Sequence, residues 1–168
     1  MIFKIAGSVM IVYGTGLYGF LKAMRPHKRY KGLLKIDTAL GVMENEINFS
    51  NALIDDVLIN AAKASGTSEI FTTCAEASGD LPVSTRWREA VLKDKDRLCL
   101  TNEDCQTIIM LSGELGMTDR VGQIKNIRHV REIIKGHINE AYEEYMKESK
   151  MLKGLGIGIG LFLVILLL

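Results

Sequence analysis

Both ends of this chain are apolar segments that contain no charged residue. Residues 5–21 lie between Lys4 and Lys22, and residues 154–168 run to the last position. As helices they would reach ~25 Å and ~22 Å, against a hydrocarbon core of roughly 30 Å. The second segment is short, so it would span only with a locally thinned bilayer and with lysines that extend to the headgroups. We predict a membrane anchor at each end.

A cleaved signal peptide is the alternative for the first segment. A signal peptide ends at small residues of the Ala-x-Ala type, whereas this segment is followed by the basic run KAMRPHKRYK. Such a run fixes the topology of a retained helix. We therefore expect the segment to remain as an anchor.

Basic residues border the middle of the chain on both sides. Six Lys and Arg residues fall within residues 22–35, before any acidic residue, and three lysines precede the second apolar segment (Lys147, Lys150 and Lys153). Because segments rich in Lys and Arg stay on the cytoplasmic side, residues 22–153 are predicted to be cytoplasmic.

Overall charge argues against two classes of partner, and cysteine usage bears on the compartment. A net charge of +1 provides no positive field for a nucleic acid and none for an acidic small molecule. Three cysteines leave one unpaired in any disulfide scheme, which fits a reducing compartment: Cys74, Cys99 and Cys105.

Between the two anchors, apolar residues recur at helical spacing. Only two prolines occur in the chain, Pro26 and Pro82, and alternating β-branched runs are absent. The first apolar stripe steps by three and four residues: Leu33, Ile36, Leu40, Met43 and Ile47. About 120 residues of this kind are enough for one hydrophobic core.

Cap and breaker residues divide the middle segment into six expected helices. The predicted N-caps of the second to sixth helices are, in order, Ser50, Thr67, Ser84, Thr101 (in a capping box with Asp104) and Thr118. The predicted helix ends are residues 64–66, Gly79 with Pro82, and Leu115. Trp87, in the fourth helix, is expected in the core; the alternative is an exposed aromatic that binds a partner.

The stretch GELGMTDRVGQIKNI, residues 113–127, is the part that most resembles a ligand loop. Gly116 suits a left-handed C-cap after Leu115, and Asp119 would face the positive end of the next helix. A phosphate loop needs a preceding strand or several converging glycine amides, and the Gly-x-x-Gly clamp of KH domains needs flanking strands and a basic groove. The surrounding sequence has neither, so we interpret the stretch as a turn.

The sixth helix is expected to be long, because no proline occurs from Thr118 to the end. A continuous helix of ~50 residues would reach about 75 Å. The predicted fold class is all-α: a six-helix bundle flanked by N- and C-terminal transmembrane helices, with the last bundle helix continuous with the C-terminal span. The expected domains are residues 1–24 (first anchor and flank), 25–150 (cytoplasmic bundle) and 151–168 (second anchor).

No motif in the sequence indicates catalysis. His129 and Glu132 form a single His-x-x-Glu without the second copy that a di-metal bundle uses, and His129 and His137 are expected as exposed helix histidines. Cys-x-x-Cys, Gly-x-Ser-x-Gly and Gly-x-x-x-x-Gly-Lys do not occur. We predict a protein that is not an enzyme and that uses no metal, cofactor or small-molecule substrate.

Glycines punctuate the C-terminal segment at two spacings. Gly154 with Gly158, and Gly156 with Gly160, each form a Gly-x-x-x-Gly pair, and the two pairs lie about 200° apart around a helix. Small residues let helices approach closely, so each face could hold a neighbouring helix, including a second copy in a homo-oligomer. The alternative is a glycine-rich span without a specific partner.

Three stretches carry a resemblance to a known family: residues 39–53 (ALGVMENEINFSNAL), 115–127 (LGMTDRVGQIKNI) and 150–168 (KMLKGLGIGIGLFLVILLL). Over nearly its whole length the chain resembles the stage III sporulation protein AB family of spore-forming Firmicutes. The residues that match the family's motifs are Glu44, Glu46, Ile47, Leu115, Gly116, Asp119, Arg120, Gln123, Lys153, Gly154 and Gly156. Met43 replaces the family's usual Leu, and Asn51-Ala52 replaces its Thr-Pro.

The resemblance implies a fold and a function. The soluble domain would be similar to the cytoplasmic domains of the inner-membrane platform protein of type II secretion and type IV pilus machines. The chain would lie in the outer forespore membrane, with its bundle in the mother-cell cytoplasm, as a non-catalytic platform of the mother cell–forespore channel complex. A cytoplasmic stage III sporulation ATPase and other channel-complex proteins are the implied partners. Residues that could lock the bundle or contact a partner are Glu44, Glu46, Asp119, Arg120 and Gln123.

A two-span membrane sensor is the rival hypothesis. Such a protein also carries a helical bundle of ~120 residues between two spans, but the bundle faces outward and binds a small ligand. Against it, the basic residues flank the middle segment, and nothing follows the second span that could signal inside.

Overall fold

The computed structural model describes residues 2–50, 53–66, 69–77, 81–113, 115 and 119–167. Side chains are described for residues 24–151 within those ranges, Glu69 excepted. This part of the chain contains six α-helices, one short 3-10 helix and no strand, so the all-α prediction is confirmed. The elements are α1 (Ile2–Phe49), α2 (Ile54–Ala64), α3 (Glu69–Glu76), α4 (Val83–Leu98), α5 (Asn102–Met110), η1 (Leu111–Gly113) and α6 (Arg120–Leu167).

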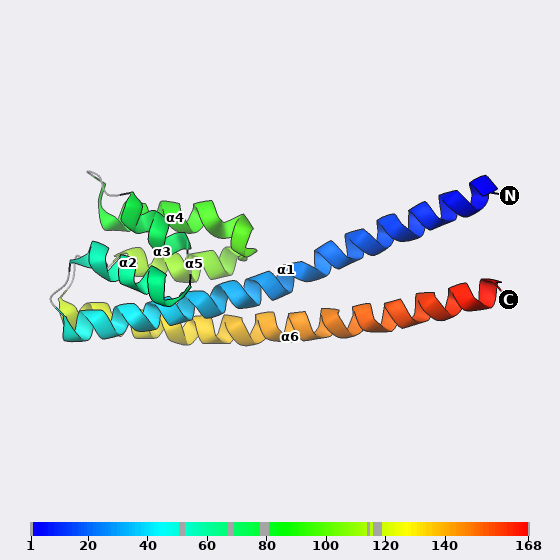
Figure 1. Cartoon of the computed structure of the whole chain (residues 1–168). Helices are drawn as coiled ribbons and strands as arrows, with labels where there is room; N and C mark the ends of the chain where they lie inside the picture. The colour runs from blue at the N-terminus through cyan, green and yellow to red at the C-terminus, as the bar shows by residue number, and fades with distance from the viewer. Residues whose placement is uncertain are drawn as a thin grey trace.

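Two long helices form the axis of the molecule. α1 and α6 run side by side in opposite directions, and α2 to α5 pack on one side of the half that is distant from the chain ends (Figure 1). The N-terminal part of α1 and the C-terminal part of α6 project from the same end of the bundle and diverge from each other (Figure 1). Both ends of the chain are thereby directed away from α2–α5.

α1 is one continuous helix of 48 residues, with Pro26 inside it. Proline has no N–H to donate to the carbonyl four residues earlier, and it usually kinks or ends a helix. Here α1 crosses the predicted domain boundary at residue 24 without interruption, and α6 likewise crosses the boundary at residue 150. The predicted first anchor and the first bundle helix therefore lie on a single α-helix, as do the last bundle helix and the second anchor.

The predicted apolar stripes form the core. On α1, Leu33, Ile36, Leu40 and Met43 are fully buried and Ile47 packs against them. Trp87 of α4 has no exposed surface, its ring meets Phe71 edge-on at a centroid distance of 5.0 Å, and its Nε1 donates to the Ile108 carbonyl at 2.8 Å. The core assignment of Trp87 is confirmed, and the partner-binding alternative is wrong.

Two predicted N-caps are wrong. The Ser50 N–H donates to the Glu46 carbonyl at 2.8 Å, so Ser50 closes the end of α1, while α2 begins four residues later behind Leu53 without a side-chain cap. α4 begins behind Pro82 rather than Ser84, because the Pro82 carbonyl already accepts the first helical hydrogen bonds. Each serine lies close to a helix boundary, but backbone hydrogen bonds there extend α1 to Ser50 and start α4 before Ser84.

Two of the other predicted helix boundaries are confirmed. Residues 64–66 end α2, where Gly66 has a φ of 62°, and Thr101 with Asp104 forms the predicted capping box of α5. The fifth helix ends earlier than predicted: α5 stops at Met110 and η1 continues to Gly113, although Leu115 is buried. The predictions for Thr67, Gly79, Gly116 and Thr118 fall outside the described residues.

Within the described part, no helix combines the length and the apolar character that crossing a membrane requires. In the predicted anchors, the backbone of residues 5–21 and 154–167 is helical, but the side chains of both segments and the whole of residue 168 lie outside the described residues. The packing predicted for Gly154, Gly156, Gly158 and Gly160 lies outside them as well.

We expect Trp87→Phe to lower the free energy of unfolding by about 1–3 kcal/mol, because the buried Ile108 carbonyl loses its donor. The measurement is urea denaturation of residues 24–151, the segment that holds the buried core residues among those the structure describes. The matched control is Leu92→Ala on the exposed side of the same helix, expected within about 0.5 kcal/mol of wild type. Equal losses for the two variants would contradict the core assignment.

Candidate functional site: the polar seam between the first and last helices

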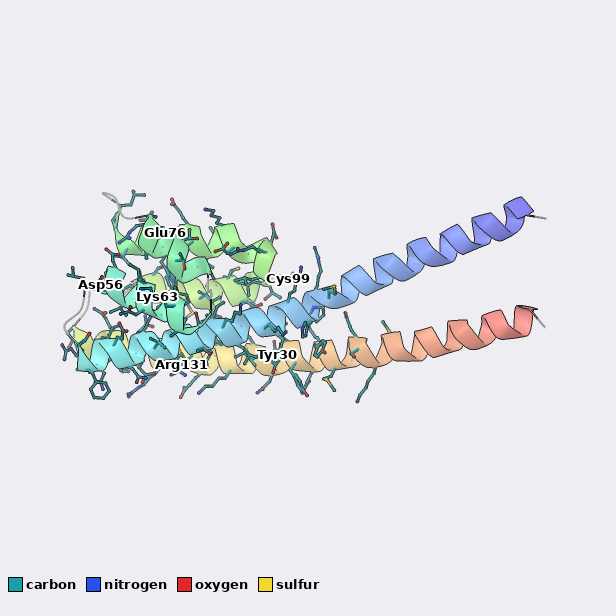
Figure 2. All side chains as sticks on the ribbon, in the orientation of Figure 1. Tyr30, Asp56, Lys63, Glu76, Cys99 and Arg131 are labelled. Carbon is teal, nitrogen blue, oxygen red and sulfur yellow. The ribbon has the colours of Figure 1, made fainter. Side chains whose placement is uncertain are left out.

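Charged side chains join α1 to α6 along the line where the two helices touch. Arg131 of α6 donates from Nε to Asp37 at 2.9 Å and from Nη1 to Glu44 at 2.8 Å. Arg128, one turn earlier on α6, donates from Nε to the other oxygen of Glu44 at 2.6 Å. Figure 2 shows Arg131 beside this contact line. We call Asp37, Glu44, Arg128 and Arg131 the polar seam.

A glycine makes room for the seam. A Cβ atom placed on Gly41 would lie 3.1 Å from Nη2 of Arg131, closer than most real contacts of such an atom. Gly41 sits between Asp37 and Glu44 on α1, one turn from each. The absence of a side chain at this position therefore leaves room for the guanidinium close to α1, where it reaches both carboxylates.

The seam lowers the pKa of Glu44. Burial alone raises the pKa of Glu44, but the hydrogen bonds and charges of Arg128 and Arg131 outweigh it, so the pKa is lowered below its ordinary value. On the other side, the hydrogen bond to Asp37 raises the pKa of Arg131 further, against the opposing effect of burial. Both partners are held in their charged forms.

A second charged cluster, which we call the buried hub, ties α5 to both long helices. Arg29 of α1 donates from Nε and Nη2 to the two oxygens of Asp104 on α5, at 2.7 and 2.9 Å, and from Nη1 to Glu144 of α6 at 3.1 Å. Asp104 has no exposed surface, and Arg29 is nearly as buried. Such a fork-to-carboxylate contact fixes direction as well as distance.

Asp104 has two roles at once. Its Oδ2 also accepts the Thr101 N–H at 2.8 Å, while its own N–H donates to the Thr101 hydroxyl at 3.1 Å, which completes the capping box of α5. Burial raises the pKa of Asp104, but the hydrogen bonds from Arg29 and Thr101 and the charge of Arg29 bring it below the ordinary value.

His137 belongs to the hub, contrary to the sequence prediction. His137 was expected to be exposed, but it is buried on α6, with Nδ1 2.9 Å from Oδ1 of Asp104 in an orientation that forms no hydrogen bond. His137 is buried because it lies on the face of α6 that packs against the core, between Ile134 and Ala141. His129 is exposed, as predicted.

Aromatic pairs close the contact line on the side of the chain ends. His27 packs on Tyr145 with ring centroids 4.6 Å apart, and Tyr30 packs on Tyr142 at 5.3 Å. Figure 2 shows Tyr30 beside α6, just before the two long helices diverge. We call these four residues the neck.

The residues singled out in the sequence make contacts within the bundle. Glu44 lies in the seam, and Glu46 accepts a hydrogen bond from Asn60 of α2 at 3.2 Å. Asp119 accepts the Gly122 N–H at 3.0 Å, so Asp119 itself caps α6 rather than following the cap. Arg120 reaches the Ser50 carbonyl at 3.4 Å, which links the start of α6 to the end of α1. Gln123 is half-buried one turn into α6, and its N–H donates to the Asp119 carbonyl.

The described residues offer little that could react. No group of three or more His, Cys, Asp or Glu among them is arranged to hold a metal ion. Burial raises the pKa of the Cys74 thiol to about 11, which keeps it protonated and unreactive at neutral pH. The carboxylates of the seam and the hub are already occupied by arginines. What the arrangement does chemically is clamp three helices together.

Arg29, Asp104 and His137 were missed as hub residues. A local signal existed for two of them: Arg29 is four residues before Leu33 on the buried side of α1, and Asp104 stands beside the buried Cys105. Their pairing spans 75 positions of sequence, and no local pattern contains it.

Comparisons with known proteins agree with this architecture. The family model for stage III sporulation protein AB matches residues 4–168. The chain belongs to that family. Stage III sporulation protein AB of Bacillus subtilis (strain 168) is 27% identical over 169 residues, covering 98% of this chain and 99% of that protein. A solved structure of stage III sporulation protein AB matches with a TM-score of 0.62 at 20% identity, over 70% of this chain and 96% of that one, which shows a shared fold. Membership supports a role in sporulation, and the family is not known as one of enzymes.

Removing the charge of Asp104 should be costly. Asp104→Asn leaves Arg29 buried beside a neutral amide, and breaking a buried pair from one side typically costs about 3–5 kcal/mol. The measurement is urea denaturation of residues 24–151. Thr101→Ala is the matched control, because it removes the same helix cap but keeps the ion pair, and should cost about 1 kcal/mol. A loss no larger than the control's would show that the hub contributes nothing beyond capping.

Acid should weaken the clamp. The pKa values of Glu44 and Asp104 are lowered in the folded state, so their stabilisation is present above their unfolded pKa of about 4 and is lost as pH falls through the folded values. Glu44→Gln should therefore flatten the decline in unfolding free energy below about pH 4. Glu132→Gln, on the exposed side of α6, should leave that slope unchanged. If the unfolding free energy of Glu44→Gln falls with the same slope as that of wild type below about pH 4, the role given to the seam is wrong.

Proposed function

We propose that this chain is a non-catalytic membrane platform of the channel complex between mother cell and forespore. Family membership supports the place in sporulation. The observation that carries the platform role is the direction of the two long helices: both terminal segments leave the bundle at the same end (Figure 1). One membrane could then take both apolar segments, with the bundle held on one side of it.

The clamp between α1, α5 and α6 supports a mechanical role. A force applied to the bundle would act on α1 and α6 together, because the seam joins them at one height and the hub and the neck join them at a second height nearer the chain ends. Rigid helices that continue from the bundle toward the chain ends would carry that force to the membrane. No bond needs to be made or broken in this chain for such a function.

The membrane-distal tip is the surface we propose for the cytoplasmic ATPase. Among the described residues, it exposes three large apolar side chains, Phe49, Leu53 and Val121, which are 83%, 75% and 72% exposed. They lie where α1 ends and where α2 and α6 begin; Figure 2 shows Asp56 at this end. Along α1 the tip is ~40 Å from Lys22, far from the bilayer, so its partner would be a soluble protein.

Orientation can be tested with one added cysteine. In the full-length variant Leu92→Cys, the new thiol at a half-exposed position of α4 should escape a membrane-impermeant maleimide in intact cells and react after permeabilisation. The wild-type chain provides the background, because Cys74 and Cys105 are buried and Cys99 is partly so. Labelling in intact cells would reject the cytoplasmic bundle and favour the outward-facing sensor.

Docking can be tested at the tip. We expect Phe49→Ser combined with Val121→Ser to abolish capture of the ATPase by the full-length chain in detergent, with an unchanged melting temperature. Leu92→Ser removes an equally apolar exposed side chain far from the tip and should retain capture. Retained capture by the double variant would exclude the tip as the docking surface.

A further inference from the structure

The basic run that follows the first apolar segment divides into one buried arginine and several exposed lysines. Arg29 is turned into the hub, where two carboxylates bind it. Lys28 and Lys31 are exposed on α1, and among the described residues neither has an ion-pair partner. On α6, Lys147 and Lys150 are exposed at the corresponding end. We call Lys28, Lys31, Lys147 and Lys150 the basic collar.

Acidic residues near the collar are mostly engaged elsewhere. Glu144 binds Arg29, and Glu140 lies 3.9 Å from the same guanidinium. Glu148 and Arg25 line the same small cavity of about 220 Å³, and because this arginine has a carboxylate in its surroundings we do not count it in the collar. Glu143 remains exposed one turn from Lys147 and reduces the positive field on α6. The lysines of α1 have no acidic neighbour before them on their own helix, because no acidic residue precedes Asp37.

The height of the collar decides what it can reach. If the first span ends at Lys22, the Cα atoms of Lys28 and Lys31 lie ~9 Å and ~14 Å beyond it along the helix. Headgroups occupy roughly the first 5–8 Å, and the field of an anionic surface extends about 8 Å further at physiological salt. Lys28 and Lys31 are inside that range. Lys35, at ~20 Å, is outside it.

Apolar side chains mark the lower rim of the collar. Met24 of α1 is 39% exposed and Met151 of α6 is 59% exposed, although both stand at the end of the bundle next to the apolar segments. Exposed methionines below a ring of lysines match a boundary where hydrocarbon gives way to charged headgroups.

We propose that the basic collar binds the anionic phospholipid headgroups of the leaflet that holds both anchors. This inference rests on the membrane anchoring proposed above. Anionic lipid is the occupant favoured by the charge of the collar and by its position at headgroup height. Binding there would hold the neck at a fixed depth and set the tilt of α1 and α6.

The experiment uses the full-length chain reconstituted in phosphatidylcholine vesicles with a minor fraction of phosphatidylglycerol. Headgroup-photoreactive analogues of the two lipids are added in turn, and crosslinking to the chain is compared. Wild type should prefer the anionic analogue, and 0.5 M salt should remove most of the preference. Each lysine near an anionic surface strengthens binding to it by a factor of about five. The double variant Lys28→Gln with Lys31→Gln should therefore lower the ratio of anionic to neutral crosslinking at least about five-fold.

Control variants distinguish lipid binding by the collar from a general effect of removing lysines. Lys35→Gln, beyond the reach of the surface field, and Lys63→Gln with Lys93→Gln, on α2 and α4, should keep the preference. An equal loss for Lys35→Gln and for the double variant Lys28→Gln with Lys31→Gln, or no preference in wild type, would overturn the proposal. Only chains that float with the vesicles after carbonate washing are scored: a chain that fails to float rejects the anchoring itself, whereas a chain that floats without lipid preference rejects the collar alone.

Discussion

The pairing of α1 with α6 is the contact on which the remaining structure depends. Every other helix packs against this pair or against a helix that does. Apolar residues supply most of the attraction, but two apolar stripes could also slide past each other by whole turns. The seam prevents this, because Arg131 reaches Asp37 and Glu44, seven positions apart, only in one register. Buried and half-buried ion pairs add little net stability. We infer that their contribution here is to select the register.

The hub fixes the position of α5 relative to the two long helices, as the seam fixes their register. Arg29 could not stay in the core without Asp104, and Asp104 could not stay there without donors for both of its oxygens. Because Asp104 also caps α5, the start of that helix is fixed at the place where α1 and α6 already meet. A local folding signal and a long-range contact thus use one carboxylate. The four short helices are positioned by this point and by the apolar core between α2, α3 and α4.

The sequence was sufficient for features that repeat within a few residues. The stripe from Leu33 to Ile47, the capping box of α5 and the unbroken α6 are local patterns, and all three are present. Ser50 and Ser84 failed because capping is one local preference among several, and the backbone around them already had helical partners. The seam and the hub could not be derived, since pairs such as Arg131 with Glu44 join positions 87 apart. A charged residue at a buried position of a stripe was the only available hint.

The division of labour between arginine and lysine links folding to the proposed membrane contact. Lys28, Arg29 and Lys31 stand within four positions of one helix, yet the arginine faces the hub and the lysines face solvent. A guanidinium can satisfy two carboxylates through fixed parallel donors, whereas an ammonium stays strongly hydrated on a flexible stem. Exchanging Arg29 with Lys28 would therefore keep composition and net charge but lose the bidentate contact to Asp104. The buried face of α1 takes Arg29 into the hub, and the lysines on its exposed face are therefore the ones left for the proposed contact with lipid headgroups.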